Sequence, residues 1–197
     1  MSANRRKKKP KAGPSGGAVR ARWRSWLAGR GPVLAFGLKF GALMVLFYAV
    51  SMTPFFDRML YAYLEANARL ANAILNGLGQ ASRVSGVTIR SARFAITVRR
   101  GCDAVEPAWF FCAAVLSFPA PFVRKIPGLL AGAALILAMN LVRIASLYLI
   151  GIYSPGFFDL AHLEIWPAAF IIAAILLWTA WIKWTGRNEP PPTYAAT

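Results

Sequence analysis

Four apolar runs in this chain approach the length that crosses a lipid bilayer, and this feature restricts the possible folds more than any other. The runs cover residues 32–53, 104–122, 126–150 and 165–184. About 20 apolar residues span the hydrocarbon core as a helix. Hydrophobic residues make up 57% of the 197 residues and charged residues only 15%, against roughly a quarter charged in a soluble domain. We therefore expect an all-α integral membrane bundle of about four transmembrane helices.

The N-terminal segment carries much of the positive charge. Ten of the 23 Lys and Arg residues, and no acidic residue, lie within the first 30 positions. Basic segments beside a transmembrane helix stay in the cytoplasm, so residues 1–31 are predicted to form a disordered cytoplasmic tail. A nucleic-acid-binding arm would also need base-reading side chains and a binding fold, so no nucleic-acid partner is expected. The Pro-rich end, residues 185–197, is predicted to be a second disordered cytoplasmic tail.

Alternation of the four runs across the bilayer then defines the two faces of the membrane domain, residues 32–184. Residues 54–103 and 151–164 are expected outside, and the short turn with Arg124 and Lys125 inside. Both termini are then cytoplasmic. Seven arginines in the first outer segment oppose this orientation, but most of them lie far from the end of an apolar run, where charge has little influence on topology.

The outer segment, residues 54–103, shows two periodicities. Between Arg58 and Gly79, apolar residues recur at helical spacing but are interrupted by polar ones, which predicts an amphipathic interfacial helix rather than a fifth span. After Gly86 the period changes to two, which predicts a small extracytoplasmic β-hairpin leading directly into the next apolar run. The alternating apolar residues of this hairpin are Val87, Ile89, Phe94, Ile96 and Val98.

Three residues suited to acyl-transfer chemistry fall at one level of this topology. Cys102 lies at the outer mouth of the second run, His162 just before the outer end of the fourth, and Arg143 about 10 Å below the outer end of the third. A thiolate is a nucleophile, and a histidine can take the thiol proton and return one to a leaving amine. An arginine stays protonated and can bind an oxyanion, and inside a span it costs about 2.5–3.5 kcal/mol, so its presence needs a reason. These three residues are our candidate catalytic set.

Further polar residues near this level are candidate supporting groups. Asn140 and Ser146 lie three residues on either side of Arg143 and give the third run a polar stripe. Glu106 lies one turn beyond Cys102, at a depth where it could meet Arg143. An Arg143–Glu106 pair that only holds helices together would indicate a different function, a non-catalytic small membrane protein such as an assembly or transport subunit. A nucleic-acid-binding membrane anchor is a third alternative, based only on the N-terminal charge.

The remaining cysteine is interpreted as structural. Cys112 lies about 15 Å deeper than Cys102, too far for a disulfide, and a buried free cysteine ordinarily acts as a small hydrophobe. With two cysteines and one histidine in the whole chain, we expect neither a metal site nor a cofactor.

The order of these motifs is similar to that of a known family. The chain contains Gly101-Cys102, then Asn140-Leu-Val-Arg143-Ile144, then His162 with Trp166 and Phe170 at the start of the last run. This order, the small size and the four-span layout resemble the exosortase/archaeosortase family, and most of all its exosortase H branch, over residues 32–184. In one departure, Asp103-Ala104 follow the cysteine where many members have small residues such as Ser-Gly. An acid there disfavours the thiolate unless Arg143, Arg99 or Arg100 offsets it.

The resemblance implies a membrane-embedded cysteine protease or transpeptidase in a bacterial cytoplasmic (inner) membrane, with its active site facing the periplasm among the membrane lipids. Its partners would be exported proteins with a C-terminal tripartite sorting signal: a short motif, a transmembrane helix and a basic end. By position, Cys102 would be the nucleophile, His162 the acid and base, and Arg143 the third essential residue. A thioester acyl-enzyme would be resolved by water or by an acceptor nucleophile of unknown identity.

Overall fold

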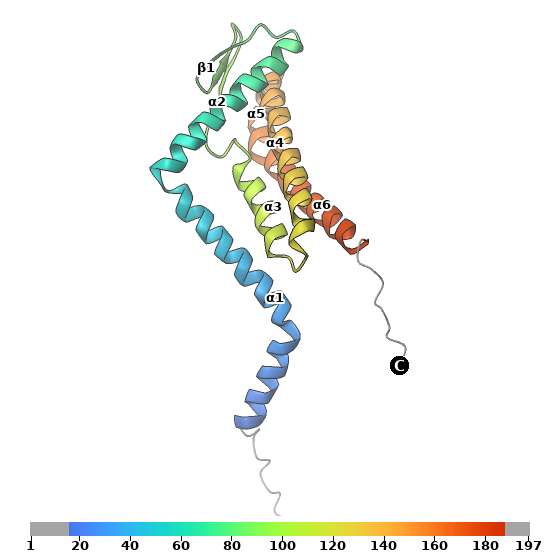
Figure 1. The fold of residues 1–197 in the computed structure, drawn as a ribbon. Coiled ribbons are helices and arrows are strands. Elements are labelled where there is room, and N and C mark those ends of the chain that lie inside the picture. Colours follow the sequence, from blue (N-terminus) through green and yellow to red (C-terminus); the bar gives the residue numbers. More distant parts are fainter. Residues whose placement is uncertain (1–15, 188–197) are drawn as a thin grey trace, which may run out of the picture.

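The computed structural model describes the backbone over residues 16–187 and the side chains over residues 30–187. Figure 1 shows α3, α4 and α6 side by side, with the C-terminal half of α1 packed beside α3, the N-terminal end of α1 extending away, and the sheet lying against α2 at the opposite end. In chain order the elements are α1 (Gly16–Ser51), α2 (Pro54–Gly77), β1 (Arg83–Ser85), β2 (Thr88–Arg90), β3 (Ala95–Thr97), α3 (Val105–Ser117), α4 (Phe122–Tyr153), η1 (Pro155–Phe157), α5 (Phe158–Leu160), η2 (Ala161–Ile165) and α6 (Trp166–Arg187).

The expectation of a mostly helical membrane bundle is confirmed, and the count of four spans is approximate. Three helical segments of the described chain are long and apolar enough to cross a membrane: Arg30–Ser51, Phe122–Tyr153 and Pro155–Arg187. The second expected span is shorter, because α3 has only 13 residues and is about 20 Å long at 1.5 Å per residue. It ends at Ser117 because Phe118, which precedes a proline, is extended with ψ of 139°.

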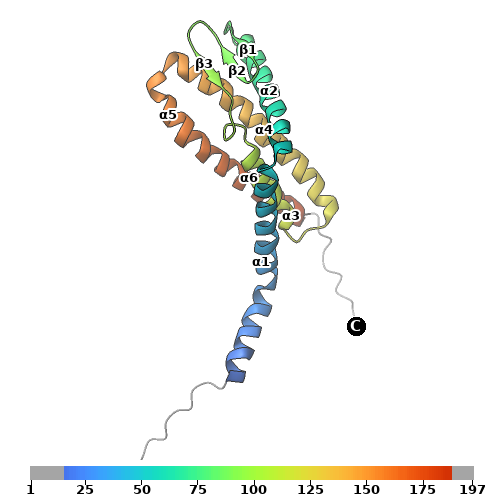
Figure 2. The ribbon, with the colours of Figure 1, turned by 90° about the vertical axis from the view of Figure 1, so that its left-hand side faces the viewer.

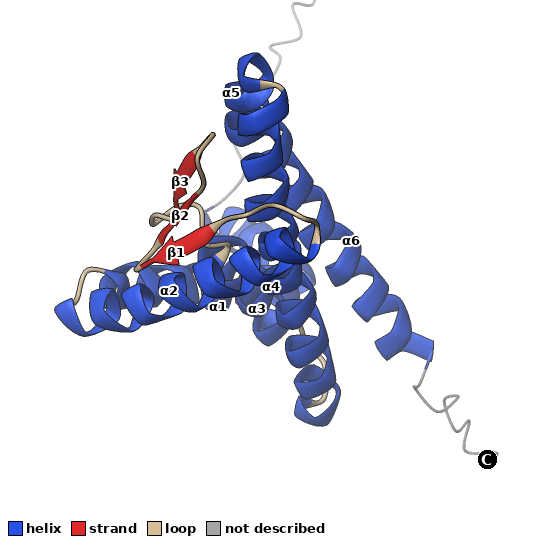
Figure 3. Ribbon diagram, turned by 90° about the horizontal axis from the view of Figure 1, so that it is seen from above, coloured by secondary structure: helices blue, strands red, loops and turns tan. Residues whose placement is uncertain are grey.

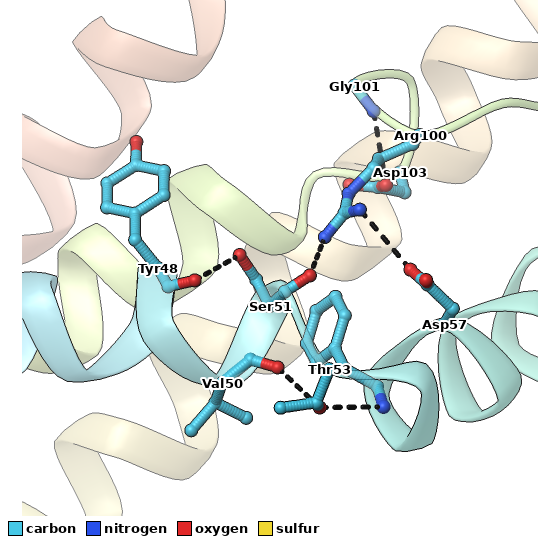
Figure 4. A network of polar contacts seen from close by, with 9 residues as sticks. Tyr48, Val50, Ser51, Thr53, Asp57, Arg100, Gly101 and Asp103 are labelled. Atoms are coloured by element: carbon cyan, nitrogen blue, oxygen red, sulfur yellow. Dashed lines mark hydrogen bonds and ion pairs between the residues drawn. The ribbon is translucent and has the colours of Figure 1, made fainter.

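The first helix starts earlier along the chain than expected. Residues 16–31 continue α1 as helix, although we assigned them to the tail. The tails predicted for residues 1–15 and 188–197 lie outside the described residues. The helix α2 begins after a sharp break in the chain. Thr53 caps α2 by accepting a hydrogen bond from Phe56 N at 3.3 Å, and Pro54 takes the first helical position (Figure 4).

The outer segment contains the predicted helix and more strands than predicted. The helix α2 packs its apolar stripe against α4 and the sheet, as an amphipathic helix does. The sheet has three antiparallel strands in the order β1-β2-β3, so the predicted hairpin is β2–β3 and β1 is an additional strand (Figure 2). The register pairs Val84 with Ile89 and Ile89 with Ile96, and these apolar side chains face the core.

Two clusters of buried side chains hold these elements together. The sheet-side core joins α2, the sheet and α4 through Leu64, Leu75, Ile89, Val98 and Tyr148, among others. The bundle core joins α3, α4 and α6, and includes Phe111, Val115, Ile136, Phe170 and Trp181. Glycines on α4 allow the close approach within the bundle core, since a Cβ on Gly132 would lie 2.1 Å from the Phe111 ring and one on Gly128 would lie 2.3 Å from Trp181.

Candidate active site

The three candidate catalytic side chains come together from three parts of the chain. Cys102 lies in the loop between β3 and α3, Arg143 lies in α4, and His162 lies in η2. The Cys102 Sγ atom is 3.1 Å from His162 Nε2, and Arg143 Nη2 lies 3.9 Å from the same sulfur. The sulfur is therefore within hydrogen-bonding distance of an imidazole that can accept its proton, and next to a permanent positive charge.

The loop that carries Cys102 is held by its own backbone and by Asp103. Gly101 and Ala104 both have positive φ, 88° and 59°, so the chain turns sharply on each side of the cysteine. The buried Asp103 carboxylate accepts hydrogen bonds from Gly101 N at 3.2 Å and from Val105 N at 2.9 Å. These two bonds close the turn and satisfy an N–H at the start of α3, so Asp103 fixes the place of Cys102.

Tyr63 of α2 supports this turn from outside the membrane spans. Its hydroxyl donates a hydrogen bond of 2.8 Å to the backbone oxygen of Asp103. Burial raises the pKa of Tyr63, the nearby Asp103 raises it further, and the Asn67 side chain lowers it. The phenol is therefore protonated throughout the neutral range and able to donate.

Arg100 ties the same loop to the junction of α1 and α2. Its guanidinium donates to Ser51 O at 2.5 Å, pairs with Asp57 at 3.3 Å, and lies 5.3 Å from the centre of the Phe56 ring (Figure 4). Arg100 is thus directed toward Asp57 and the end of α1. Arg99, in contrast, lines the cavity that contains the Cys102 thiol.

His162 is held by a series of aromatic contacts. It lies in a short π-helical stretch between α5 and α6, a form often found at functional sites. Its ring lies 5.6 Å from that of Phe158, which lies 5.9 Å from Phe94, which in turn lies 5.8 Å from Tyr148. The turn before β3 therefore packs between α4 and the element that carries the histidine.

Arg143 is a buried cation with few protein partners. Its side chain is 6% exposed, and its guanidinium lies 5.7 Å from the centre of the Phe170 ring. Within the described residues its Nε has no hydrogen-bond partner. Since a buried donor without a partner costs free energy, this N–H is available for an acceptor from outside the chain.

The three supporting candidates do not surround the sulfur. Asn140 is fully buried and donates to Asn67 Oδ1 at 3.3 Å, which links α4 to α2. Ser146 Oγ donates to the backbone oxygen of Arg143 at 2.9 Å, within its own helix. Glu106 is exposed, and among the described residues Arg69 pairs with Glu65 and Arg100 with Asp57, whereas Glu106 and Arg143 form no ion pair. The expected meeting of Glu106 with Arg143 does not occur, because α3 turns Glu106 toward a second cavity, which is also lined by Phe47 and Met52.

The site itself contains a cavity of about 150 Å³. Its lining combines the cysteine, arginine and histidine with apolar side chains of α4 and α5 and with residues 96–99 at the end of the sheet. The second cysteine is elsewhere, since Cys112 is a free thiol of α3 packed against the bundle core. Among the described residues, no three His, Cys, Asp or Glu side chains gather into a group that could hold a metal ion.

Sequence reasoning missed the residues that position the loop and the histidine. From the sequence alone, Asp103 is only an unfavourable charge beside the thiol, although an Asp two residues before a helical N–H is a common turn and capping signal. Tyr63 and Phe94 carried no signal, because both occur in apolar patterns that indicate ordinary packing.

The comparisons with known proteins identify the family of this chain. The sequence model of one family, described as Transmembrane exosortase (Exosortase_EpsH), matches residues 21–179. No curated protein and no solved structure matches the chain. The match covers most of the chain, so the chain belongs to the transmembrane exosortase family. At the level of the family, this membership supports a role as a multi-pass membrane transpeptidase in protein sorting.

Proposed function

We propose that this chain is a membrane-embedded cysteine protease or transpeptidase that removes the C-terminal sorting signal of exported proteins. The observation that carries the proposal is the 3.1 Å contact between Cys102 Sγ and His162 Nε2, with Arg143 beside the sulfur. A thiol and an imidazole at this distance have the geometry of a nucleophile and its base. Family membership supports the reaction class, and the exposed position of Glu106 disfavours a purely structural role for Arg143.

In the proposed reaction, His162 takes the proton of the Cys102 thiol while Sγ attacks the carbonyl carbon of the scissile peptide bond. The carbonyl oxygen gains the negative charge, and the guanidinium of Arg143 stabilises it. The carbon–nitrogen bond then breaks, His162 returns the proton to the leaving amine, and a thioester remains on Cys102. Water or an acceptor amine or hydroxyl attacks this thioester, which releases the processed chain and restores the thiol.

The orientation of the chain in the membrane is part of the same proposal. Residues 32–184 form the membrane domain, both termini are cytoplasmic, and the site faces the periplasm of a bacterial inner membrane. The supporting observation is the distribution of charge, since ten basic residues and no acidic one lie in the first 30 positions. The transmembrane helix of the substrate lies in the bilayer, so that its short motif reaches Cys102.

The test is co-expression with exported reporter proteins that end in a short motif, a transmembrane helix and a basic segment. Mass analysis of the reporter's C-terminus is expected to show loss of the tail. A product with the mass of a free carboxylate indicates water as acceptor, and a heavier product indicates transfer to another nucleophile. Reporters that keep intact tails at normal enzyme levels would contradict the proposal.

A further inference from the structure

The outer edge of β3 has unpaired backbone groups. Two hydrogen bonds set the phase of the β2–β3 ladder, Val98 N to Val87 O and Ser91 N to Phe94 O, both at 2.9 Å. In an antiparallel ladder, pairs that exchange hydrogen bonds alternate with pairs that do not. By this alternation, the N–H and C=O groups of Ile96 in β3, and those of the flanking residues Phe94 and Val98, point toward β2.

The backbone N–H and C=O groups of the residues between them therefore point away from β2. Ala95 and Thr97 direct their N–H and C=O groups away from β2, and both residues are exposed. Within the described chain, no backbone hydrogen bond beyond the β2–β3 ladder involves either residue. Since β3 ends the strand order, these four groups form an open sheet edge that can pair with another extended chain.

This open edge borders the reacting atoms. Ile96, Thr97, Val98 and Arg99 line the cavity that also contains Cys102, Arg143 and His162. In the view from above, β3 is the strand on the side of the sheet nearest α5, which leads into the helical stretch of His162 (Figure 3). A peptide that follows the edge therefore runs directly into the catalytic cavity.

The size and lining of the cavity indicate how much of a bound peptide lies along the edge of β3 and which side chains it carries. A volume of about 150 Å³ holds little more than one or two residues of a peptide, so the rest of a bound segment must lie outside it. Successive side chains of a strand point to opposite faces, so every second side chain of a paired peptide faces the cavity wall. That wall includes Ile144, Leu147 and Phe158, which favour an apolar side chain.

We propose that the substrate segment containing the scissile bond binds as an added β-strand on the outer edge of β3. Backbone hydrogen bonds to Ala95 and Thr97 align the segment, and apolar side chains at alternate positions select it, as in other cases of strand addition. The inference rests on the proposed function, because its ligand is the substrate of that reaction. It adds the place and conformation in which the substrate is held.

The first test needs no change to the enzyme. The probe is a synthetic peptide with the tail sequence of a reporter that the purified wild-type protein processes in detergent. Each residue of its motif segment is N-methylated in turn, which removes one backbone donor without changing the side chain. Methylation at every second residue should lower kcat/KM by about 3- to 10-fold, while the residues between them tolerate it.

The second test changes the edge. Thr97→Pro removes an N–H that points away from β2, so the ladder keeps its hydrogen bonds and the substrate loses one. Thr88→Val on β2 is the matched control, because it removes the same hydroxyl contact between Thr88 and Thr97 at 3.0 Å and leaves the backbone N–H of Thr97 in place. Processing is expected to fall about 3- to 10-fold through KM in the proline variant and to stay near normal in the valine variant, with equal amounts of folded protein in the membrane.

The outcomes separate the two proposals. If the wild type processes the peptide but methylation has no effect, or an equal effect at every position, strand addition is wrong and the proposed function stands. If the wild type processes no reporter and no peptide, the proposed function and the strand addition that rests on it are both overturned.

Discussion

The ring of Phe94 packs directly against Gly151 of α4. It fills the space that the Cβ atom of any other residue at position 151 would occupy. A Cβ at Gly151 would lie 2.3 Å from the ring, and other ring atoms lie at 2.4 and 2.7 Å. This contact fixes the turn before β3 against α4, and the same ring reaches Phe158, next to His162. Gly151 therefore sets how closely the turn before β3 approaches α4, at a point where that turn also contacts the residue next to the histidine ring.

Gly151→Ala is expected to destabilise the protein and to reduce processing. The added methyl group displaces the Phe94 ring, and overpacking of this kind costs about 1–3 kcal/mol, more than an alanine gains in a helix. Thermal unfolding in detergent measures the stability, and tail cleavage measures the activity. Gly156→Ala is the control, since a Cβ there meets nothing within 4 Å and should change neither quantity.

The two cysteines should behave differently. Cys102→Ala is expected to abolish processing while the protein stays in the membrane, because it removes the proposed nucleophile. Cys112→Ala should keep most of the activity, since this thiol packs against the bundle core away from His162. Mass analysis of the reporter tail, with immunoblotting for membrane level, makes the comparison. Equal loss of processing in both variants would remove Cys102 from its proposed role.

Arg143→Lys tests whether charge alone is enough at this position. A lysine keeps the positive charge but lacks the planar set of donors, so we expect cleavage to fall about 10²–10³-fold at normal expression. Glu106→Gln should have little effect, because Glu106 is exposed and forms no ion pair with Arg143. Single-turnover measurement of acyl-enzyme formation distinguishes the two variants. Near-normal acylation by the lysine variant would leave Cys102 and His162 as a dyad.

Tyr63→Phe tests the support of the cysteine loop. Loss of the hydrogen bond to Asp103 should cost about 0.5–1.5 kcal/mol of stability. Burial raises the pKa of Tyr63 above its usual value of about 10, so the neutral phenol is favoured by folding. The contribution of the Tyr63 hydroxyl to the free energy of unfolding is therefore complete below about pH 10, and it is lost as the pH rises through the raised pKa of Tyr63.

The measurement for Tyr63→Phe is a pair of urea unfolding curves in detergent across neutral and alkaline pH. The difference in unfolding free energy between wild type and variant should stay constant up to about pH 10 and shrink above it. A difference that already disappears near neutral pH would show that the phenol ionises there and that its environment is not as described.

Much of the fold could be predicted because membrane helices and alternating strands have strong local signals. Depth along the apolar runs was enough to bring Cys102, Arg143 and His162 to one level. Depth alone could not place Glu106, because it does not determine which neighbouring helix a side chain faces. In the structure, α3 directs Glu106 away from Arg143. The strand β1 was missed because Arg83–Ser85 contains a single apolar residue, Val84, whereas the alternating pattern around β2 and β3 extends from Val87 to Val98.

The short α3 has a consequence for the lipid around it. A helix of about 20 Å reaches across only about two thirds of a 30 Å hydrocarbon core, whereas α4, with 32 residues, exceeds it. Such a hydrophobic mismatch is relieved when the bilayer thins beside the short element or when the polar segment at its end sinks below the headgroups. Cys102 lies just before the N-terminal end of α3. In the proposed orientation, the site should therefore make a local depression in the outer leaflet, which brings water to a depth that lipid would otherwise occupy.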